Sequence, residues 1–309
     1  MISISNISKK FNNSVALDNI SFNIPSDSIT AIVGANGAGK TTLLKILVKL
    51  LDADSGQINY ENVTSIKEFR SKIGYLPEQR GLYTDVDIKT QLMHFASIRG
   101  ISKKEALQNV SYWLKKFGVN HLEHMKINTL SKGMQQKIQL ISSLVNMPSL
   151  LFMDEPLSGL DPLNFRYFCS LIKEYQLEYN TTIVLSTHNM TSVEHLCSSV
   201  AILNKAKLQD FGSITDIKKK YSTNGRYYFN VKKSNLLIFN RSNILNPSFS
   251  YKIIDIDPEI AKIEVVSLKK DSSLLNALEY LKNIFSHIDI ISCAESIPSM
   301  EDIFVEINQ

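Results

Sequence analysis

Apolar runs separated by polar breaks predict alternating strands and helices along the first two-thirds of this 309-residue chain. Residues 1–30 favour an antiparallel hairpin region that leads into a buried strand over 29–33, and the stretch 42–47 predicts a helix. Two more buried strands are predicted, one from the apolar residues 150–153 and one from the β-branched stretch 181–187. This pattern predicts an α/β core.

Between Glu68 and His124 the pattern becomes helical. Ser102 is followed three residues later by Glu105, which is the spacing of a capping box. The apolar residues after it share one helical face, and they are Leu107, Val110, Leu114 and Phe117. A second helical stripe ends at Pro148 and consists of Met134, Ile138, Ile141 and Val145. Both stripes predict amphipathic helices.

A change of composition near Ile214 to Ser222 predicts a second domain. We expect a first domain over 1–215, a polar linker over 216–225 and a small α+β domain over 226–309. The strands predicted in this last part cover 226–231, 251–256, 261–268 and 287–292, and its helices cover 274–285 and 300–307. The three cysteines are widely spaced and an odd number, which fits a reducing compartment.

The segment from Gly34 to Thr41 matches the phosphate-binding loop G-x-x-x-x-G-K-[ST] between a predicted strand and a predicted helix. Its glycines let backbone N–H groups turn towards an anion, and the helix start adds its positive dipole end. Lys40 is expected to reach the β- and γ-phosphates of ATP, and Thr41 to bind Mg²⁺. The predicted nucleotide-binding residues are Gly34, Ala35, Asn36, Gly37, Ala38, Gly39, Lys40, Thr41 and Thr42. The alternative is a Gly-rich turn that matches by chance.

The predicted strand 150–153 is followed by two carboxylates, Asp154 and Glu155. Asp154 is placed to hold Mg²⁺ together with Thr41, as in phosphoryl-transfer sites of this class. Glu155 is the candidate general base that orients the attacking water, and its alternative is a Glu that merely faces solvent. His188 follows the strand 181–187, where it can contact a γ-phosphate, although a lone His is usually structural or exposed.

The order and spacing of these motifs resemble the nucleotide-binding subunit of ABC transporters over roughly the first two-thirds of the chain. The resemblance implies that Ser131 and Gly133 form the signature motif and contact the γ-phosphate of ATP bound to a second subunit. It places Asp161 in the loop that crosses the dimer interface and makes His188 the switch histidine. Phe11 occupies the position of an aromatic that stacks on adenine, and a core Phe is an equally good interpretation.

The chain departs from the family pattern at three positions. Lys132 and Met134 replace the usual Gly and Gln of the signature motif, which leaves the phosphate contacts of Ser131 and Gly133 in place. In the segment that resembles the glutamine loop, Glu78 follows a proline and Gln79 comes next. Either residue could meet Mg²⁺, because a carboxylate serves equally well as a metal or water ligand.

By the same resemblance, a helical subdomain at about 80–148 receives the coupling helix of a membrane partner. Leu82, Tyr83 and Val86 are the candidate contacts, and packing within the subdomain is the alternative. The ending 298–304 resembles the tail of many type-2 exporter ATPases of the sodium, drug and antibiotic branch.

These features together predict an ATP-hydrolysing subunit that energises a membrane exporter. Its expected partners are integral-membrane permease subunits and a second ATP-binding subunit, at the cytoplasmic face of the inner membrane. We see no N-terminal signal and no apolar run of spanning length. The alternative is a soluble ABC-type ATPase with a regulatory or nucleic-acid- or ribosome-linked role. The net charge of +4 is mild, so nucleic acid is not an expected partner.

Overall fold

The chain divides into two compact units in the computed structural model. The first comprises Met1–Ile214 with Phe304–Gln309, and the second comprises Thr215–Ile303. The residues that the structure describes are 1–12, 14–61, 63–79, 81–222, 225–233, 249–255, 259–267, 273–285, 288–296 and 298–308. Arg80, Thr223, Asn224, Ile256, Leu268 and His287 belong to predicted motifs or elements but lie outside these residues.

A six-stranded sheet forms the centre of the first unit, in the order β5-β6-β7-β3-β8-β9. Its strands are β3 (Ile29–Gly34), β5 (Ile73–Leu76), β6 (Leu150–Asp154), β7 (Thr182–Thr187), β8 (Ser199–Asn204) and β9 (Lys207–Ser213). All neighbours pair in parallel except β8 and β9. The side chains of β3 and β7 are buried throughout, as expected for strands covered on both faces. The segments after β3, β5, β6 and β7 therefore meet at one edge of the sheet.

A smaller antiparallel sheet has the order β2-β1-β4, with β1 at Ile2–Phe11, β2 at Ser14–Ile24 and β4 at Ser55–Tyr60. Its apolar side chains share one core with helix α1 (Lys40–Leu47) and with the larger sheet. The predicted hairpin over residues 1–30 is thus confirmed as β1 and β2.

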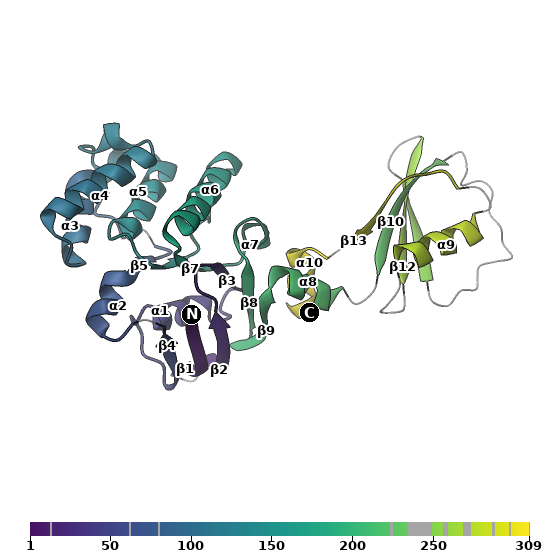
Figure 1. Ribbon diagram of the computed structural model, residues 1–309, viewed down its shortest axis with the longest axis horizontal. Coiled ribbons are helices and arrows are strands. Elements are labelled where there is room, and N and C mark those ends of the chain that lie inside the picture. The colour runs from purple at the N-terminus through teal and green to yellow at the C-terminus, as the bar shows by residue number, and fades with distance from the viewer. Residues whose placement is uncertain are drawn as a thin grey trace. The chain divides into compact units, whose positions relative to one another are not determined.

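The remaining helices of the first unit lie around these sheets. They are α2 (Ile66–Lys72), α3 (Ile88–Ile98), α4 (Lys103–Lys116), α5 (Lys132–Leu144), α6 (Pro162–Tyr179) and α7 (Met190–Leu196), with 3-10 turns η1 (Asn120–Leu122) and η2 (Ile127–Thr129). Helices α3, α4 and α5 form a group apart from β1, β2 and β4 (Figure 1). The predicted α/β class with a phosphate-loop core sheet is confirmed.

The second unit contains a four-stranded antiparallel sheet in the order β11-β12-β10-β13. The strands are β10 (Arg226–Lys232), β11 (Phe249–Asp255), β12 (Ile260–Ser267) and β13 (Ile290–Ser296). Alternate residues of β10 and β12 are buried, and α9 (Leu274–Ile284) packs on them. The chain also forms α8 (Ile214–Tyr221) and α10 (Met300–Asn308).

Two sequence predictions differ from the structure in this part of the chain. The linker predicted from residue 216 is helical up to Tyr221, because α8 extends through the lysine triplet. The strand predicted over 287–292 is β13 at Ile290–Ser296, because it follows its partner β10 as far as the pair Arg226 and Ser296. In the first unit, Met134 begins the apolar stripe predicted at helix spacing, and it is exposed in the first turn of α5.

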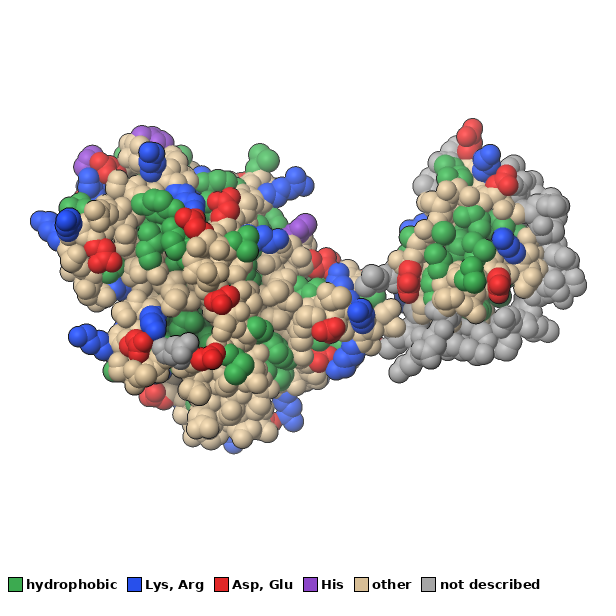
Figure 2. Space-filling view, viewed as in Figure 1, with side chains coloured by type: hydrophobic (Ala, Val, Ile, Leu, Met, Phe, Trp, Pro, Cys, Tyr) green, Lys and Arg blue, Asp and Glu red, His purple; other side chains and the backbone are tan. Residues whose placement is uncertain are grey.

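The visible surface of the first unit carries charges of both signs. Lys and Arg side chains alternate with Asp and Glu over the face drawn in Figure 2, so charge is not gathered into a single patch there.

Candidate functional site

The phosphate loop joins β3 to α1 through glycines that the backbone requires. Gly39 caps α1 with φ of 105°, a left-handed conformation, and Gly37 has φ of 81°. A Cβ atom on Gly39 would lie 2.4 Å from the carbonyl oxygen of Ala16. The start of α1 has no side-chain cap and no acidic residue in its first turn. Its free N–H groups therefore suit an anion.

Lys40 is the first residue of α1 and is almost fully buried. Its Nζ donates to the carbonyl oxygens of Gly34 at 2.9 Å and Ala35 at 3.2 Å. These bonds hold the ammonium group across the loop, where a phosphate would lie against it.

Asp154 ends β6 beside the start of α1. Its Oδ1 accepts hydrogen bonds from Thr41 Oγ1 at 3.1 Å and from Ser186 Oγ. Ser186 is the register partner of Asp154 on the neighbouring strand β7, which explains the second bond. Ser186 was not predicted as a site residue, because only strand pairing brings it to the carboxylate.

The pair Thr41 and Asp154 fits Mg²⁺. This ion prefers oxygen ligands in octahedral geometry at about 2.0–2.1 Å, so that adjacent ligands lie about 2.9 Å apart. Thr41 Oγ1 and Asp154 Oδ1 are oxygen ligands of the kind that Mg²⁺ prefers, and they lie 3.1 Å apart. Among the described residues there is no group of three or more His, Cys, Asp or Glu that could hold a metal ion. A Mg²⁺ ion here would take its remaining ligands from water and nucleotide, as is usual for this metal.

Glu155 follows in a left-handed conformation, with φ of 48°. This conformation is uncommon for a residue other than glycine. Glu155 Oε1 lies 2.7 Å from His188 Nδ1, and Oε2 accepts from Thr187 Oγ1 at 3.2 Å. Both carboxylate oxygens are thus held by residues at the end of β7. This arrangement holds the Glu155 carboxylate in one position beside the phosphate loop.

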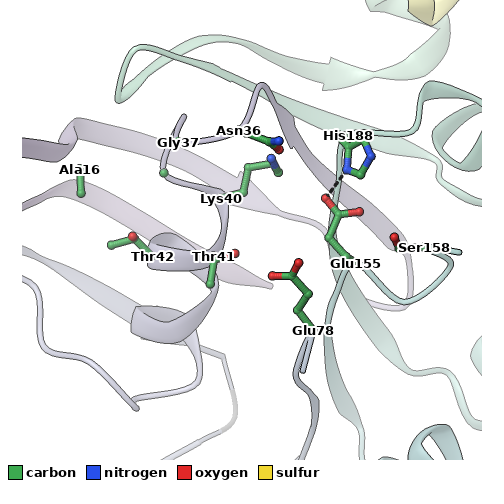
Figure 3. A pocket seen from close by; sticks show the side chains of 11 residues that line it. Ala16, Asn36, Gly37, Lys40, Thr41, Thr42, Glu78, Glu155, Ser158 and His188 are labelled. Atoms are coloured by element: carbon green, nitrogen blue, oxygen red, sulfur yellow. Dashed lines mark hydrogen bonds and ion pairs between the residues drawn. The ribbon is translucent and has the colours of Figure 1, made fainter. Parts of the chain in front are cut away.

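Residues of the phosphate loop, together with Glu78, Glu155 and His188, line a pocket of about 420 Å³ (Figure 3), and Asp154 is not among the lining residues. Lys40 and Thr41 lie on one side, and Glu78, Glu155 and His188 lie on the other. The predicted residues that line the pocket are Asn36, Gly37, Gly39, Lys40, Thr41, Thr42, Glu78, Glu155 and His188. Ala16 and Ser158 also line it and were not predicted. Ala16 reaches the loop from β2, a neighbour that the local sequence does not reveal.

The glutamine-loop segment contributes Glu78, whereas Gln79 is not among the lining residues. Tyr75, on β5 before this segment, has a pKa raised to about 12 by burial and then by the charges of Asp154 and Glu78. The two carboxylates therefore act on the same tyrosine, Asp154 from the end of β6 and Glu78 from the loop after β5.

Ser131, Gly133 and Asp161 do not line this pocket. Ser131 caps α5 by accepting from the backbone N–H of Met134, and Asp161 caps α6 by accepting from Leu163 and Asn164. The hydrogen bonds from Asn164 lower the pKa of Asp161. Both caps are exposed at helix starts.

Phe11 ends β1 and is 46% exposed. Lys9 Nζ lies over the Phe11 ring, 5.7 Å from the ring centroid. Phe11 does not line the pocket. The alternative of a core Phe is therefore wrong, because nearly half of the side chain faces solvent.

A family profile described as ABC transporter matches residues 17–158. The chain is 40% identical over 230 residues to the ABC transporter ATP-binding protein MJ1023 of Methanocaldococcus jannaschii, with 73% of this chain and 84% of that protein covered. The chain belongs to the ABC transporter ATP-binding protein family. This ABC ATP-binding subunit is also 29% identical to the bacitracin transport ATP-binding protein BcrA of Bacillus licheniformis, over 99% of this chain and 97% of that one.

The solved structures agree with this membership. A structure described as the ATP-binding subunit of an ABC transporter matches with a TM-score of 0.65 and 26% identity, covering 72% of this chain and 93% of that one. The ABC ATP-binding subunit is therefore an ATPase, and subunits of this kind dimerise and work with membrane permease partners. No helix in the described part of the chain is long and apolar enough to cross a membrane.

Proposed function

We propose that this chain is the ATP-hydrolysing subunit of a membrane exporter, bound at the cytoplasmic membrane face to separate permease subunits. One observation carries the catalytic part of the proposal: the phosphate loop, Asp154 and the Glu155–His188 pair meet at one edge of the sheet. The exporter assignment is supported by the full-length likeness to a bacitracin transport protein and by the tail at 298–304.

ATP binds with its phosphates on the loop from Gly34 to Thr42. The backbone N–H groups and Lys40 hold the β- and γ-phosphates, and Thr41, Asp154 and Glu78 hold Mg²⁺. When bound, Mg²⁺ neutralises negative charge on the phosphates. The support for Glu78, rather than Gln79, is its place in the pocket lining.

Glu155 orients the attacking water and accepts its proton, and His188 holds the Glu155 carboxylate and contacts the γ-phosphate. The 2.7 Å contact between Glu155 Oε1 and His188 Nδ1 supports these roles. Because Thr187 engages the other carboxylate oxygen, the base is fixed in one rotamer before substrate binds.

Two copies of the ATPase domain bind two ATP molecules between them, as a homodimer or with a related chain. Ser131 and Gly133 contact the γ-phosphate held by the opposite subunit, and Asp161 lies at the interface. The support is that these residues sit at exposed helix starts outside their own pocket. The exposed Phe11 ring, at the end of β1, stacks on adenine.

The helical region at about 80–148 receives the permease. Tyr83 is 54% exposed, and its ring stacks on that of Phe95 with 6.1 Å between the ring centroids. The backbone N–H of Tyr83 donates to Oε1 of the buried Gln91 at 2.6 Å. A half-exposed aromatic on a fixed backbone is the kind of residue that anchors a partner helix. Leu82 and Val86 complete the proposed contact. The ATPase domain comprises Met1–Ile214 with Phe304–Gln309, and Thr215–Ile303 forms the separate domain. The expected domain over 226–309 is therefore too long at its end, where Asn204 Nδ2 donates to the carbonyl oxygen of Ile307.

Affinity purification of the tagged full-length chain from detergent-solubilised membranes tests this function. Recovery of a multi-span permease together with ATPase activity supports it. Tyr83→Ala should reduce recovery of the permease, whereas Tyr112→Ala, an exposed tyrosine on α4, should not. Recovery of ribosomes or nucleic acid without a permease would contradict the exporter assignment.

A further inference from the structure

Two glutamines on α5, the helix that begins at the signature motif (the signature helix), donate hydrogen bonds to the loops that carry Glu155 and Glu78. Gln136 Nε2 donates to the carbonyl oxygen of Pro156 at 2.8 Å. Gln139 Nε2 donates to the carbonyl oxygen of Pro77 at 2.8 Å. Pro156 directly follows Glu155, and Pro77 directly precedes Glu78. One helix is therefore tied to the backbone beside both carboxylates.

Both glutamines are buried on the same face of α5. They are three residues apart, so they lie on one face of α5, the helix that packs against β5. Gln136 is 9% exposed and Gln139 is 5% exposed. A buried amide without a hydrogen bond is destabilising, so both side chains require these partners.

Each of the two loops contains a proline next to its acidic residue. Proline has no N–H group, so neither Pro77 nor Pro156 can donate a backbone hydrogen bond. Their carbonyl oxygens still require donors when buried. The glutamine amides satisfy these acceptors, and they do so from a helix that Ser131 caps and whose first turn contains Gly133.

We propose that Gln136 and Gln139 are positioning residues that couple the signature helix to the hydrolysis site of the same chain. Gln136 holds the backbone next to Glu155 at a fixed position relative to α5, and Gln139 holds the backbone next to Glu78 in the same way. The inference rests on the proposed function, in which the start of α5 meets ATP held by the second subunit. Docking of that ATP then moves, through two hydrogen bonds, the residues that act on this subunit's own ATP.

Gln→Met substitutions test the coupling, because Met has nearly the same length and no amide. Gln136→Met should lower kcat about tenfold, the effect of losing roughly one hydrogen bond at the base, while the Kd for ATP changes less than about twofold. Gln139→Met should weaken Mn²⁺ binding about tenfold, measured by electron paramagnetic resonance with a non-hydrolysable ATP analogue, since Mn²⁺ reports the Mg²⁺ ligands.

Asn146→Leu is the matched control. Asn146 Nδ2 donates to the carbonyl oxygens of Ile73 at 2.9 Å and Ser71 at 3.2 Å, beyond the opposite end of α5. This variant loses the same kind of bond without touching the site, so its kcat and Mn²⁺ binding should match the parent protein. Thermal unfolding of all three variants, with the native chain, accounts for any general loss of stability.

The outcomes separate this inference from the function on which it rests. If Gln136→Met and Gln139→Met both behave like Asn146→Leu while Glu155→Gln loses hydrolysis, the coupling is refuted and the proposed function stands. If Glu155→Gln itself stays active, the proposed catalytic role fails. A rise in the Kd for ATP equal to the loss of kcat would also overturn the inference, because it would indicate general damage to the pocket.

Discussion

Glu155 Oε1 lies 2.7 Å from His188 Nδ1, so the proposed base and the histidine after β7 form one hydrogen-bonded pair. His188 is the more exposed partner, with 55% of its side chain accessible against 10% for Glu155. The histidine therefore covers the carboxylate from the solvent side and leaves its own ring accessible to a ligand. This geometry makes the two residues one functional unit.

Replacement of His188 by Ala should release one oxygen of Glu155. We expect kcat to fall about 10- to 100-fold, because a misplaced catalytic group can cost that much, while ATP binding changes little. His195→Ala is the control, since His195 is an exposed histidine on the adjacent helix α7. Steady-state ATPase assays compare the two, and equal rates for both variants would refute the role of His188.

Replacement of Lys40 by Ala should weaken ATP binding about 10- to 100-fold or more. The variant loses at least one charge-assisted bond to phosphate, worth about 1.5–3 kcal/mol. Lys45→Ala removes an exposed lysine from the last turn of the same helix and should bind normally. Fluorescent-nucleotide titration gives both affinities, and an unchanged Kd for Lys40→Ala would disprove the phosphate-loop assignment.

Ser186→Ala should reduce Mg²⁺ affinity about 10- to 100-fold, because it removes a partner that orients a proposed metal ligand, Asp154. Ser199→Ala removes a buried hydroxyl of the same sheet, which bonds to Thr30 Oγ1 at 2.8 Å. The control should lose comparable stability and keep its Mg²⁺ affinity. Mn²⁺ binding with an ATP analogue distinguishes the two, and similar affinities would remove Ser186 from the site.

Glu68 provides a pH-dependent part of the stability. Hydrogen bonds from Lys72, and then from the backbone and hydroxyl of Thr64, lower the pKa of Glu68 from 4.5 to about 2. Because the folded pKa is depressed, this contribution is present above pH 4.5 and is lost as the pH falls to about 2. Glu68→Gln should abolish this part of the acid loss. Lys72→Met should raise the pKa of Glu68 in the folded chain, so that this stability is lost at a higher pH. Urea unfolding of the native chain and both variants between pH 5 and 2 would show these changes. An identical dependence of unfolding free energy on pH in all three chains would contradict the role of Glu68.

The local motifs of the site could be predicted because each contains its own signal. A buried strand, a Gly-rich turn and a helix start placed Lys40 and Thr41, and a strand ending in carboxylates placed Asp154 and Glu155. The bond between Ser186 and Asp154 could not be predicted in this way, because it depends on which strands are neighbours and in which register they pair.

Some elements were missed or misplaced from the sequence. Strands β8 and β9 are joined at Lys205 and Ala206, both left-handed with φ of 48° and 66°. Two such residues are typical of a type I′ turn, whose central positions usually hold Asn, Asp or Gly. Because Lys205 and Ala206 occupy these positions, the sequence did not indicate a hairpin here. Strand β13 is an edge strand whose side chains are mostly exposed, and its hydrophobic pattern consequently placed it three residues too early.

The role of Glu155 as the base is tested by the Glu155→Gln variant, with ATP hydrolysis and the ATP-dependent oligomeric state measured on the same preparation. We predict normal ATP binding, hydrolysis reduced about 10²- to 10⁴-fold, and a dimer that persists in ATP and Mg²⁺ because the opening step is blocked. Glu174→Gln, on α6, should hydrolyse ATP as the native chain does. A Glu155→Gln protein that hydrolyses ATP at the native rate would contradict the account.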